Sequence, residues 1–323
     1  MNKLNRRGLL ATGAALLVPG AAGAQGAWPS KPIRWVVPYT AGGFTDVSTR
    51  LTLEKITLGQ SFVVENKPGA NGAIGVQSVM ASPPDGYTLL LHGSAGVTIY
   101  QAVMKQPAFD TLRDLTPISL VIYFDLILCA NPALPFRTVK EFVAYAKANP
   151  GKLSYGTAGV GAMNHVGTEW FKGIAGIDIV HVPYRGDAPV AADLAAGVLG
   201  VAFVSSNVAI PLIKAGKLRA LAAPSRRRIA VLPDMPTMAE AGYPDFDLQP
   251  WTALFGPAGL DKTIVASLDE ALKQVLAEPD VIERLAGLSM TPAATTPEEL
   301  TRIVEKSIAL WKGVAAKAKI VVE

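Results

Sequence analysis

A repeated alternation of short apolar strands with helices is the feature that most constrains how this chain can fold. Apolar residues 33–37 predict a strand, and a helical stretch over residues 46–58 follows it. Strands at residues 61–65 and 87–91 flank a further helix at residues 73–81. This βαβαβ order predicts a parallel sheet with helices on both of its faces.

A long apolar segment at residues 115–130 separates this series from a second one. Pro117 and Asp125 interrupt it, which disfavours a membrane span and favours a strand that leaves one domain and enters another. The second series predicts alternating helices and strands at residues 138–149, 153–156, 162–175, 178–182, 188–196, 201–204, 209–215 and 218–222. At roughly 150 residues per domain, a chain of 323 residues has room for about two domains.

The last quarter of the sequence predicts a return to the first domain. Residues 248–255 predict the returning strand, and helices follow at residues 262–276, 279–286 and 297–317. Thr138 and Thr296 are expected to cap the helices that follow them. We expect an α/β protein of two domains with two crossings, near residues 120–125 and 250–253. Residues 25–122 and 251–323 would form the first domain, and residues 123–250 the second.

Residues 1–24 have the pattern of an export signal. Lys3, Arg6 and Arg7 precede an apolar run, and Ala22-Gly23-Ala24 resembles a cleavage site. The pair Arg6-Arg7 also resembles a twin-arginine signal. We therefore predict a periplasmic protein in bacterial terms.

Removal of this segment lowers the formal net charge from +4 to +1. The remaining chain carries no basic stripe, so no nucleic-acid partner is expected. The single cysteine, Cys129, lies in an apolar run and is expected to be a small core residue.

Two glycine-rich turns stand where a predicted strand leads into a helix. The first runs from Tyr39 through Gly42 and Gly43 to Asp46, and the second covers residues 157–162. Such a turn exposes unpaired backbone N–H groups at the positive end of the helix dipole, which suits an anion. Either turn alone could be a tight connection that needs glycine. The pair, in matching positions of two series, favours a binding site between two domains.

The dinucleotide motif G-x-G-x-x-G, the phosphate-loop motif G-x-x-x-x-G-K-[ST] and the nucleophile elbow G-x-S-x-G are absent from the sequence. Gly159 and Gly161 lack the third glycine of a dinucleotide motif, and Ser94 has no G-x-S-x-G surroundings. No group of His, Asp, Glu or Cys has the spacing of metal ligands. We therefore expect no catalytic residue, no metal and no cofactor.

Several polar residues at strand ends could contact a ligand. His165, in the first turn of a predicted helix, could face the ligand, although packing or capping is the favoured interpretation. Asp187 could be a helix N-cap or accept a hydrogen bond from the ligand, and Arg185 could pair with a carboxylate or lie in solvent. Ser94 and Ser205 end strands on the same predicted side. His181 is expected to be a hydrogen-bonded core residue.

The order and spacing of these motifs resemble the extracytoplasmic solute receptors of tripartite tricarboxylate transporters, also called the Bug family. The similarity extends over almost the whole chain after the signal. It is carried by Trp28–Ile33, Gly42-Gly43 with Asp46 and Arg50, residues 64–70, 84–89, 155–161, 181–186, 214–221 and 232–237. Ala41 and Ala162 depart from the family, which often has proline and serine there.

The resemblance implies a two-domain periplasmic binding protein of the type II, Venus-flytrap class. Members of that family hold a small carboxylate between the two turns by backbone amides and bridging waters. The expected ligand-binding residues are Tyr39, Thr40, Ala41, Gly42, Gly43, Asp46, Ser94, Thr157, Ala158, Gly159, Gly161, Ala162, His165, Arg185, Asp187 and Ser205.

The leading hypothesis is a monomeric receptor whose domains close on a small-molecule carboxylate and which then docks to a membrane permease or a sensor. The alternative is an exported α/β enzyme that uses His165 or Asp187 as its acid or base. A structural surface protein is a third class, but the two glycine-rich turns would have no function in such a protein.

Overall fold

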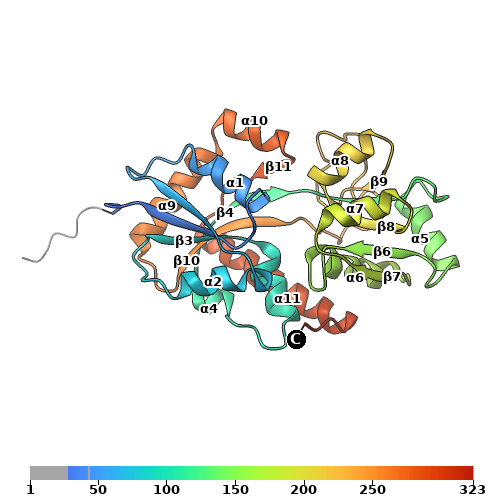
Figure 1. Cartoon of the computed structure of the whole chain (residues 1–323), viewed down its shortest axis with the longest axis horizontal. Helices are drawn as coiled ribbons and strands as arrows, with labels where there is room; N and C mark the ends of the chain where they lie inside the picture. The colour runs from blue at the N-terminus through green and yellow to red at the C-terminus, as the bar shows by residue number, and fades with distance from the viewer. Residues whose placement is uncertain (1–27, 43, 323) are drawn as a thin grey trace, which may run out of the picture.

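The computed structural model describes residues 28–42 and 44–322, apart from the side chain of Asn71. The predicted export signal and Gly43 of the first turn lie outside these residues. Two β-sheets form two lobes that lie side by side (Figure 1). We call the lobe built on the six-stranded sheet lobe 1 and the lobe built on the five-stranded sheet lobe 2.

The sheet of lobe 1 contains both parallel and antiparallel pairs. Its strands, in the spatial order β11-β4-β10-β3-β1-β2, are β11 (Met290–Pro292), β4 (Leu115–Phe124), β10 (Trp251–Pro257), β3 (Thr88–Gly93), β1 (Ile33–Val37) and β2 (Phe62–Asn66). β1 is parallel to β2 and β3, as the βαβαβ order predicts. β10 is antiparallel to β3 and β4, and β11 is antiparallel to β4. The prediction of a parallel sheet is therefore confirmed for β1, β2 and β3, and β10 and β11 add antiparallel pairs to it.

Helices cover both faces of this sheet, as expected. Along β1, Ile33 and Trp35 pack into one buried cluster, and Val36 packs into another on the opposite face. This division follows from the alternation of side chains along a strand. The helices of lobe 1 are α1 (Phe44–Leu53), α2 (Ala73–Met80), α3 (Tyr100–Val103), α4 (Thr111–Asp114), α9 (Lys262–Leu276), α10 (Pro279–Gly287) and α11 (Pro297–Ala318), with a short 3₁₀ turn η1 (Ala70–Gly72) and a π-helical turn η2 (Ala95–Ile99).

Lobe 2 repeats this layered arrangement on a smaller sheet. Its strands, in the order β7-β6-β8-β5-β9, are β7 (Val180–Pro183), β6 (Ser154–Thr157), β8 (Val201–Ser205), β5 (Leu126–Ala130) and β9 (Arg219–Ala222). Its helices are α5 (Val139–Ala148), α6 (Met163–Ala175), α7 (Asp187–Ala195) and α8 (Ser206–Lys214). Along β5, Leu128 faces one buried cluster and Cys129 the other. Cys129 is a buried free thiol, as predicted.

The two lobes are joined by two adjacent stretches of chain. β4 ends at Phe124 and β5 begins at Leu126, so the predicted long strand changes sheets at Asp125. The chain returns to lobe 1 just before Trp251, which begins β10. The two crossings are hydrogen-bonded to each other, because Phe124 N donates to the Pro250 carbonyl over 3.1 Å and Gln249 Nε2 donates to Asp125 Oδ1 over 3.3 Å. Figure 1 shows both crossings as stretches of chain that run from one lobe to the other.

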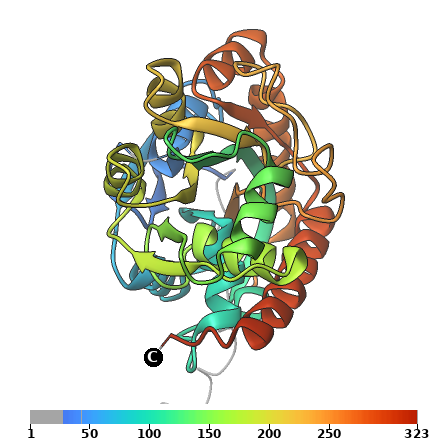
Figure 2. The ribbon, with the colours of Figure 1, turned by 90° about the vertical axis from the view of Figure 1, so that its right-hand side faces the viewer.

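The last helix makes a further connection that the sequence did not predict. α11 packs on β4 and α3 in lobe 1, and its later turns pack on α6 in lobe 2. Its Trp311 and Val314 belong to the buried cluster of lobe 2. Figure 2, which looks onto lobe 2 with lobe 1 behind it, shows α11 along the side of the molecule.

Most predicted helix limits agree with the structure to within a few residues. Thr138 and Thr296 each form a complete capping box, with Glu141 and Glu299 respectively, which confirms the predicted caps. Of the helices within the described ranges, none is long and apolar enough to cross a membrane. The sequence pattern did not predict η2, α3, α4 or β11, which are all five residues or shorter.

Candidate functional site

A cleft of about 650 Å³ lies between the lobes, at the ends of the strands that precede the two glycine-rich turns. Eight of the predicted ligand-binding residues line it: Tyr39, Thr40, Ser94, Ala158, Ala162, Arg185, Asp187 and Ser205. The first three belong to lobe 1 and the others to lobe 2. The structure therefore brings the two turns to one cleft, as ligand binding at a sheet's carboxyl edge requires.

The remaining predicted residues are placed differently. Ala41, Gly42, Asp46, Thr157, Gly159, Gly161 and His165 do not line the cleft, and Gly43 is outside the described residues. Further residues line the cleft that were not predicted from the sequence, including Phe44, Phe124, Met163, Asn164 and Pro250. Phe44, Met163 and Asn164 lie in or next to the predicted turns, so their place in the sequence could have indicated that they line the cleft. Phe124 and Pro250 come from the crossings, whose meeting depends on tertiary pairing.

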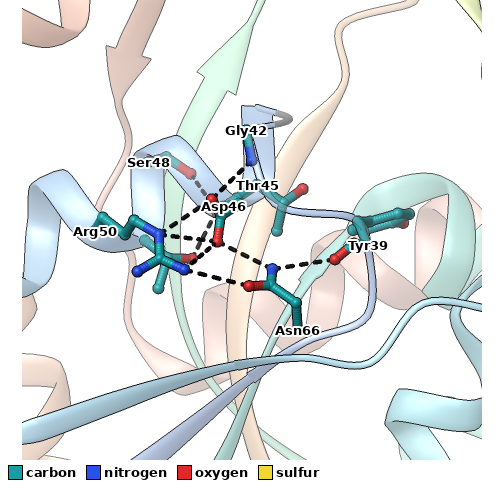
Figure 3. A network of polar contacts seen from close by, with 8 residues as sticks. Tyr39, Gly42, Thr45, Asp46, Ser48, Arg50 and Asn66 are labelled. Carbon is teal, nitrogen blue, oxygen red and sulfur yellow. Dashed lines mark hydrogen bonds and ion pairs between the residues drawn. The ribbon is translucent and has the colours of Figure 1, made fainter.

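Asp46 holds the first turn through a network of hydrogen bonds (Figure 3). Its carboxylate accepts hydrogen bonds from Gly42 N over 2.9 Å, from Arg50 Nε over 3.1 Å and from Asn66 Nδ2 over 3.0 Å. Asn66 also donates to the Tyr39 carbonyl over 3.1 Å, which ties the end of β2 to the turn. Gly42 has φ of 84°, a conformation that favours glycine. Asp46 thus shapes the turn and uses the N–H of Gly42.

A pair of histidines supports the second turn in a similar way. Gly161 N donates to His165 Nδ1 over 3.1 Å, and Thr157 Oγ1 is 2.6 Å from His181 Nε2. The two imidazole rings stack with centroids 4.0 Å apart. His165 is buried, whereas His181 is half-buried, so the prediction that His181 is hydrogen-bonded is confirmed and its placement in the core is wrong.

Asp187 lies in the cleft wall and is fixed by two neighbouring elements. Its carboxylate accepts from Asn164 Nδ2 of α6 over 3.0 Å and from the backbone N–H and hydroxyl of Ser205, at the end of β8. Asp187 is the first residue of α7, and its side chain makes no cap, so its prediction as an N-cap is wrong. Burial raises the pKa of Asp187, and the hydrogen bonds from Ser205 and Asn164 oppose that shift.

The cleft holds little charge. Arg185 and Asp187 are the charged side chains among its described lining residues, and Arg185 is exposed. The first helical residues of α6 receive no hydrogen bond from the side chain of their N-cap, Ala162. These backbone N–H groups therefore offer an anion a site that needs no cationic side chain. Within the described residues, no three His, Cys, Asp or Glu side chains gather as metal ligands would.

A second groove, of about 580 Å³, lies between α6 and α11. Trp170 and Leu310 are among its lining residues, and no predicted ligand-binding residue reaches it. The glycine-rich turns therefore point to the cleft between the lobes as the candidate site.

Tyr39 on the cleft wall is held by a buried histidine. Its hydroxyl is 3.1 Å from Nδ1 of His92, whose side chain has no exposed surface and whose Nε2 has no hydrogen-bond partner in the described structure. Gly72 and Gly96 leave the room that the imidazole occupies, because a Cβ at either position would overlap its ring. The tyrosyl ring is thus fixed where it borders the ligand cleft.

We expect Tyr39→Phe to lower the free energy of unfolding by about 1 to 3 kcal/mol, because it leaves a second buried nitrogen of His92 without a partner. Denaturant unfolding at neutral pH would measure the change. Tyr145→Phe is the control, since the Tyr145 hydroxyl makes none of the side-chain hydrogen bonds of the described chain. Equal stability of the two variants would contradict a supporting role for His92.

Comparisons with known proteins agree with this arrangement. The sequence model of the tripartite tricarboxylate transporter family receptors matches residues 49–320. Protein BugT of Bordetella pertussis is 36% identical over 290 residues, which cover 89% of this chain and 89% of BugT.

Solved structures show the same fold. A periplasmic transporter is 36% identical, with a TM-score of 0.80 over 92% of this chain and 100% of that chain. Rpa4515 of R. palustris, solved with adipate, is 33% identical, with a TM-score of 0.80 over 91% and 99% of the two chains. MatC of Rhodopseudomonas palustris, solved with bound malate, is 30% identical, with a TM-score of 0.76 over 88% and 99%.

Proposed function

Because this chain belongs to the family of tripartite tricarboxylate transporter receptors, we propose that it captures a small organic carboxylate between its two lobes. Members of this family are periplasmic solute-binding proteins. The observation that carries the proposal is that two glycine-rich turns, one from each lobe, line the same cleft. The similar structures with adipate and with malate support a carboxylate as the ligand.

The proposed mechanism is closure of the lobes around the ligand. The crossings at Asp125 and at residues 249–250 would act as the hinge, with residues 25–122 and 251–323 as one domain and residues 123–250 as the other. The ligand carboxylate would accept hydrogen bonds from backbone N–H groups at the starts of α1 and α6. Tyr39, Thr40, Ser94, Ala158, Ala162, Arg185, Asp187 and Ser205 would contact it directly or through water. The other residues expected from the sequence would shape the turns.

In the cell, we propose that residues 1–24 direct the chain to the periplasm and are removed. The closed monomer would then dock to a membrane permease of the tripartite type or to a sensor. An exported enzyme would need His165 or Asp187 as its acid or base. His165 does not line the cleft and its Nδ1 accepts a hydrogen bond from Gly161 N, which favours the receptor.

The proposal is tested by adding mono-, di- and tricarboxylates to the purified mature protein and following thermal unfolding. A ligand at 100 times its Kd should stabilise the protein by about 2.7 kcal/mol. Mass spectrometry should show that the same compound is returned unchanged. Conversion of the compound would instead support the exported enzyme.

Ala162→Asp is expected to raise the stability of the folded protein and to lower its affinity for the ligand. An aspartate at this uncapped N-cap should raise the stability of the ligand-free protein by about 1 kcal/mol. Its carboxylate would occupy the N–H groups proposed for the ligand and repel an anion, so the affinity should fall at least about tenfold, or about 1.4 kcal/mol. Calorimetry would measure both quantities.

Ala162→Asn is the matched control for this variant, because it caps the helix without adding charge. It should be stabilised by a similar amount and lose less affinity than Ala162→Asp. Unchanged affinity in Ala162→Asp would place the carboxylate away from the start of α6.

A further inference from the structure

Two phenylalanines form an aromatic wall in the cleft. The rings of Phe44 and Phe124 stack with centroids 4.7 Å apart and planes at 19°. Both side chains pack on the buried cluster of lobe 1, remain half-buried and line the cleft. Phe44 begins α1 directly after the first glycine-rich turn, and Phe124 ends β4 at the crossing. A ligand held at the first turn therefore lies beside a fixed aromatic pair.

Asp187 contributes the opposite chemistry from lobe 2. An ionised carboxylate accepts hydrogen bonds and donates none, and the contacts with Asn164 and Ser205 hold this one in place. Among the described residues, Oδ2 of Asp187 accepts from Ser205 and Oδ1 accepts one hydrogen bond, from Asn164 Nδ2, so one lone pair of Oδ1 is left for a donor on the ligand. A hydrogen-bond donor on the ligand would complete the contacts of this carboxylate, whereas a second ligand carboxylate beside the ionised Asp187 would be repelled.

The rest of the cleft agrees with a ligand that has one charge and an apolar body. Arg185 is the cationic side chain among the described lining residues, and it is exposed on the loop before α7. Ala95, Leu126, Met163 and Val208 add further apolar surface. A flexible dicarboxylate would leave this surface and the aromatic pair without complementary contacts.

We propose that the cleft selects an aromatic monocarboxylate that carries a hydroxyl or amino group. This inference rests on the proposed function, because it assigns the ligand carboxylate to the glycine-rich turns. The aromatic ring packs beside Phe44 and Phe124, and the hydroxyl or amino group donates to Asp187. The adipate and malate of the related structures each fit less well, because adipate has no donor beyond its carboxyl groups and malate has no apolar body.

The test compares affinities by calorimetry for meta- and para-hydroxybenzoate, para-aminobenzoate, benzoate, terephthalate, cyclohexanecarboxylate, malate and adipate. The best substituted benzoate should bind about tenfold or more tightly than benzoate, because it adds a hydrogen bond to a charged acceptor. Terephthalate should bind no better than benzoate. The benzoates should bind about two- to tenfold more tightly than cyclohexanecarboxylate, because aromatic pairs add to simple burial.

Two pairs of variants locate these preferences in the cleft. Asp187→Asn should remove most of the advantage of the hydroxyl or amino group, while Asp193→Asn on the same helix should retain it. Asp193 is a suitable control because its carboxylate accepts from the Tyr184 hydroxyl, away from the cleft lining. Phe44→Leu should reduce the preference for the aromatic ring, and Phe62→Leu, which contacts Trp35 outside the cleft, should not.

The outcomes distinguish this inference from the proposed function. Tight binding of malate or adipate without binding of the benzoates would overturn the inference and leave the receptor for a carboxylate intact. Failure of every carboxylate to bind, or conversion of any of them, would overturn both. An equal effect of Asp187→Asn and Asp193→Asn on the selectivity would overturn the assignment to Asp187.

Discussion

Asp46→Ala should abolish most ligand binding although Asp46 does not line the cleft. The substitution releases Gly42 N and leaves Arg50 and Asn66 without their shared acceptor. The first turn then loses the contact that fixes its left-handed residue Gly42 and one of its two links to Asn66 of β2. We expect an affinity about a hundredfold lower, which corresponds to about 2.8 kcal/mol.

The same substitution should also destabilise the ligand-free protein. The Asp46 side chain is 4% exposed, whereas that of its partner Arg50 is 50% exposed. Burial tends to raise the pKa of Asp46, but hydrogen bonds from Arg50, Gly42 and Asn66 outweigh it and hold the pKa below its usual value. Because the Arg50 side chain is half exposed to water, we expect the free energy of unfolding to fall by about 2 kcal/mol. Breaking a fully buried ion pair would cost more.

Calorimetric titration and denaturant unfolding would measure these two effects. Asp280→Ala is the matched control, because Asp280 pairs with Lys55 at the surface and its side chain is 50% exposed. It should cost less than about 1 kcal/mol and leave binding unchanged. If Asp46→Ala loses stability but keeps its affinity, the first turn does not hold the ligand.

The positions of the two turns could be predicted because they depend on local chemistry. Each turn lies within about ten residues of an apolar strand before it and a helix start after it. These patterns can be recognised from the local sequence alone. The resemblance to a receptor family then placed the turns across a cleft. Which side chains of a turn face the ligand could not be predicted, because both sides of a helix start offer N–H groups. Asp46 accepts a hydrogen bond from Gly42 N and His165 accepts one from Gly161 N, and neither side chain lines the cleft.

The mixed sheets depend on pairings between residues that are far apart in the sequence. β10 lies between β3 and β4, and its residue Thr252 pairs with Gly93 and Ile122. The strand pattern gives no indication of this order, since an apolar strand can be parallel or antiparallel to its neighbours. Phe124 and Pro250 reach the cleft only through this pairing. For the same reason, the packing of α11 on α6 could not be derived from its own helical pattern.

Acidification should destabilise the protein as the pH falls from about 6.5 towards about 4. Burial lowers the pKa of His92 to about 3 from a usual value of 6.5. Burial, and then the charge of the neighbouring His181, lower the pKa of His165 to about 4. The unfolded chain therefore takes up protons before the folded protein does. The stability is fully present above about pH 6.5 and is lost progressively as the pH falls towards the folded pKa values.

The loss should be on the order of 3 kcal/mol for each of His92 and His165, because each pKa unit corresponds to about 1.4 kcal/mol. Protonation of His165 at Nδ1 also removes the acceptor for Gly161 N, so ligand binding should weaken over the same pH range. The charges around His165 oppose each other: Glu169 raises its pKa, whereas His181 and Lys172 lower it. Burial therefore decides the direction.

Urea unfolding at about pH 7.5, 6 and 4.5 would measure this dependence. His165→Asn is the informative variant, because its amide oxygen can accept from Gly161 N but does not titrate. At neutral pH the free energy of unfolding of His165→Asn should equal that of the parent protein. In acid it should fall less than that of the parent, since one of the buried imidazoles is gone. If the stability of His165→Asn falls with pH as steeply as that of the parent protein, protonation of His165 does not destabilise the folded protein. The second turn would then be held by contacts other than its histidine, and the parallel with Asp46 at the first turn would fail.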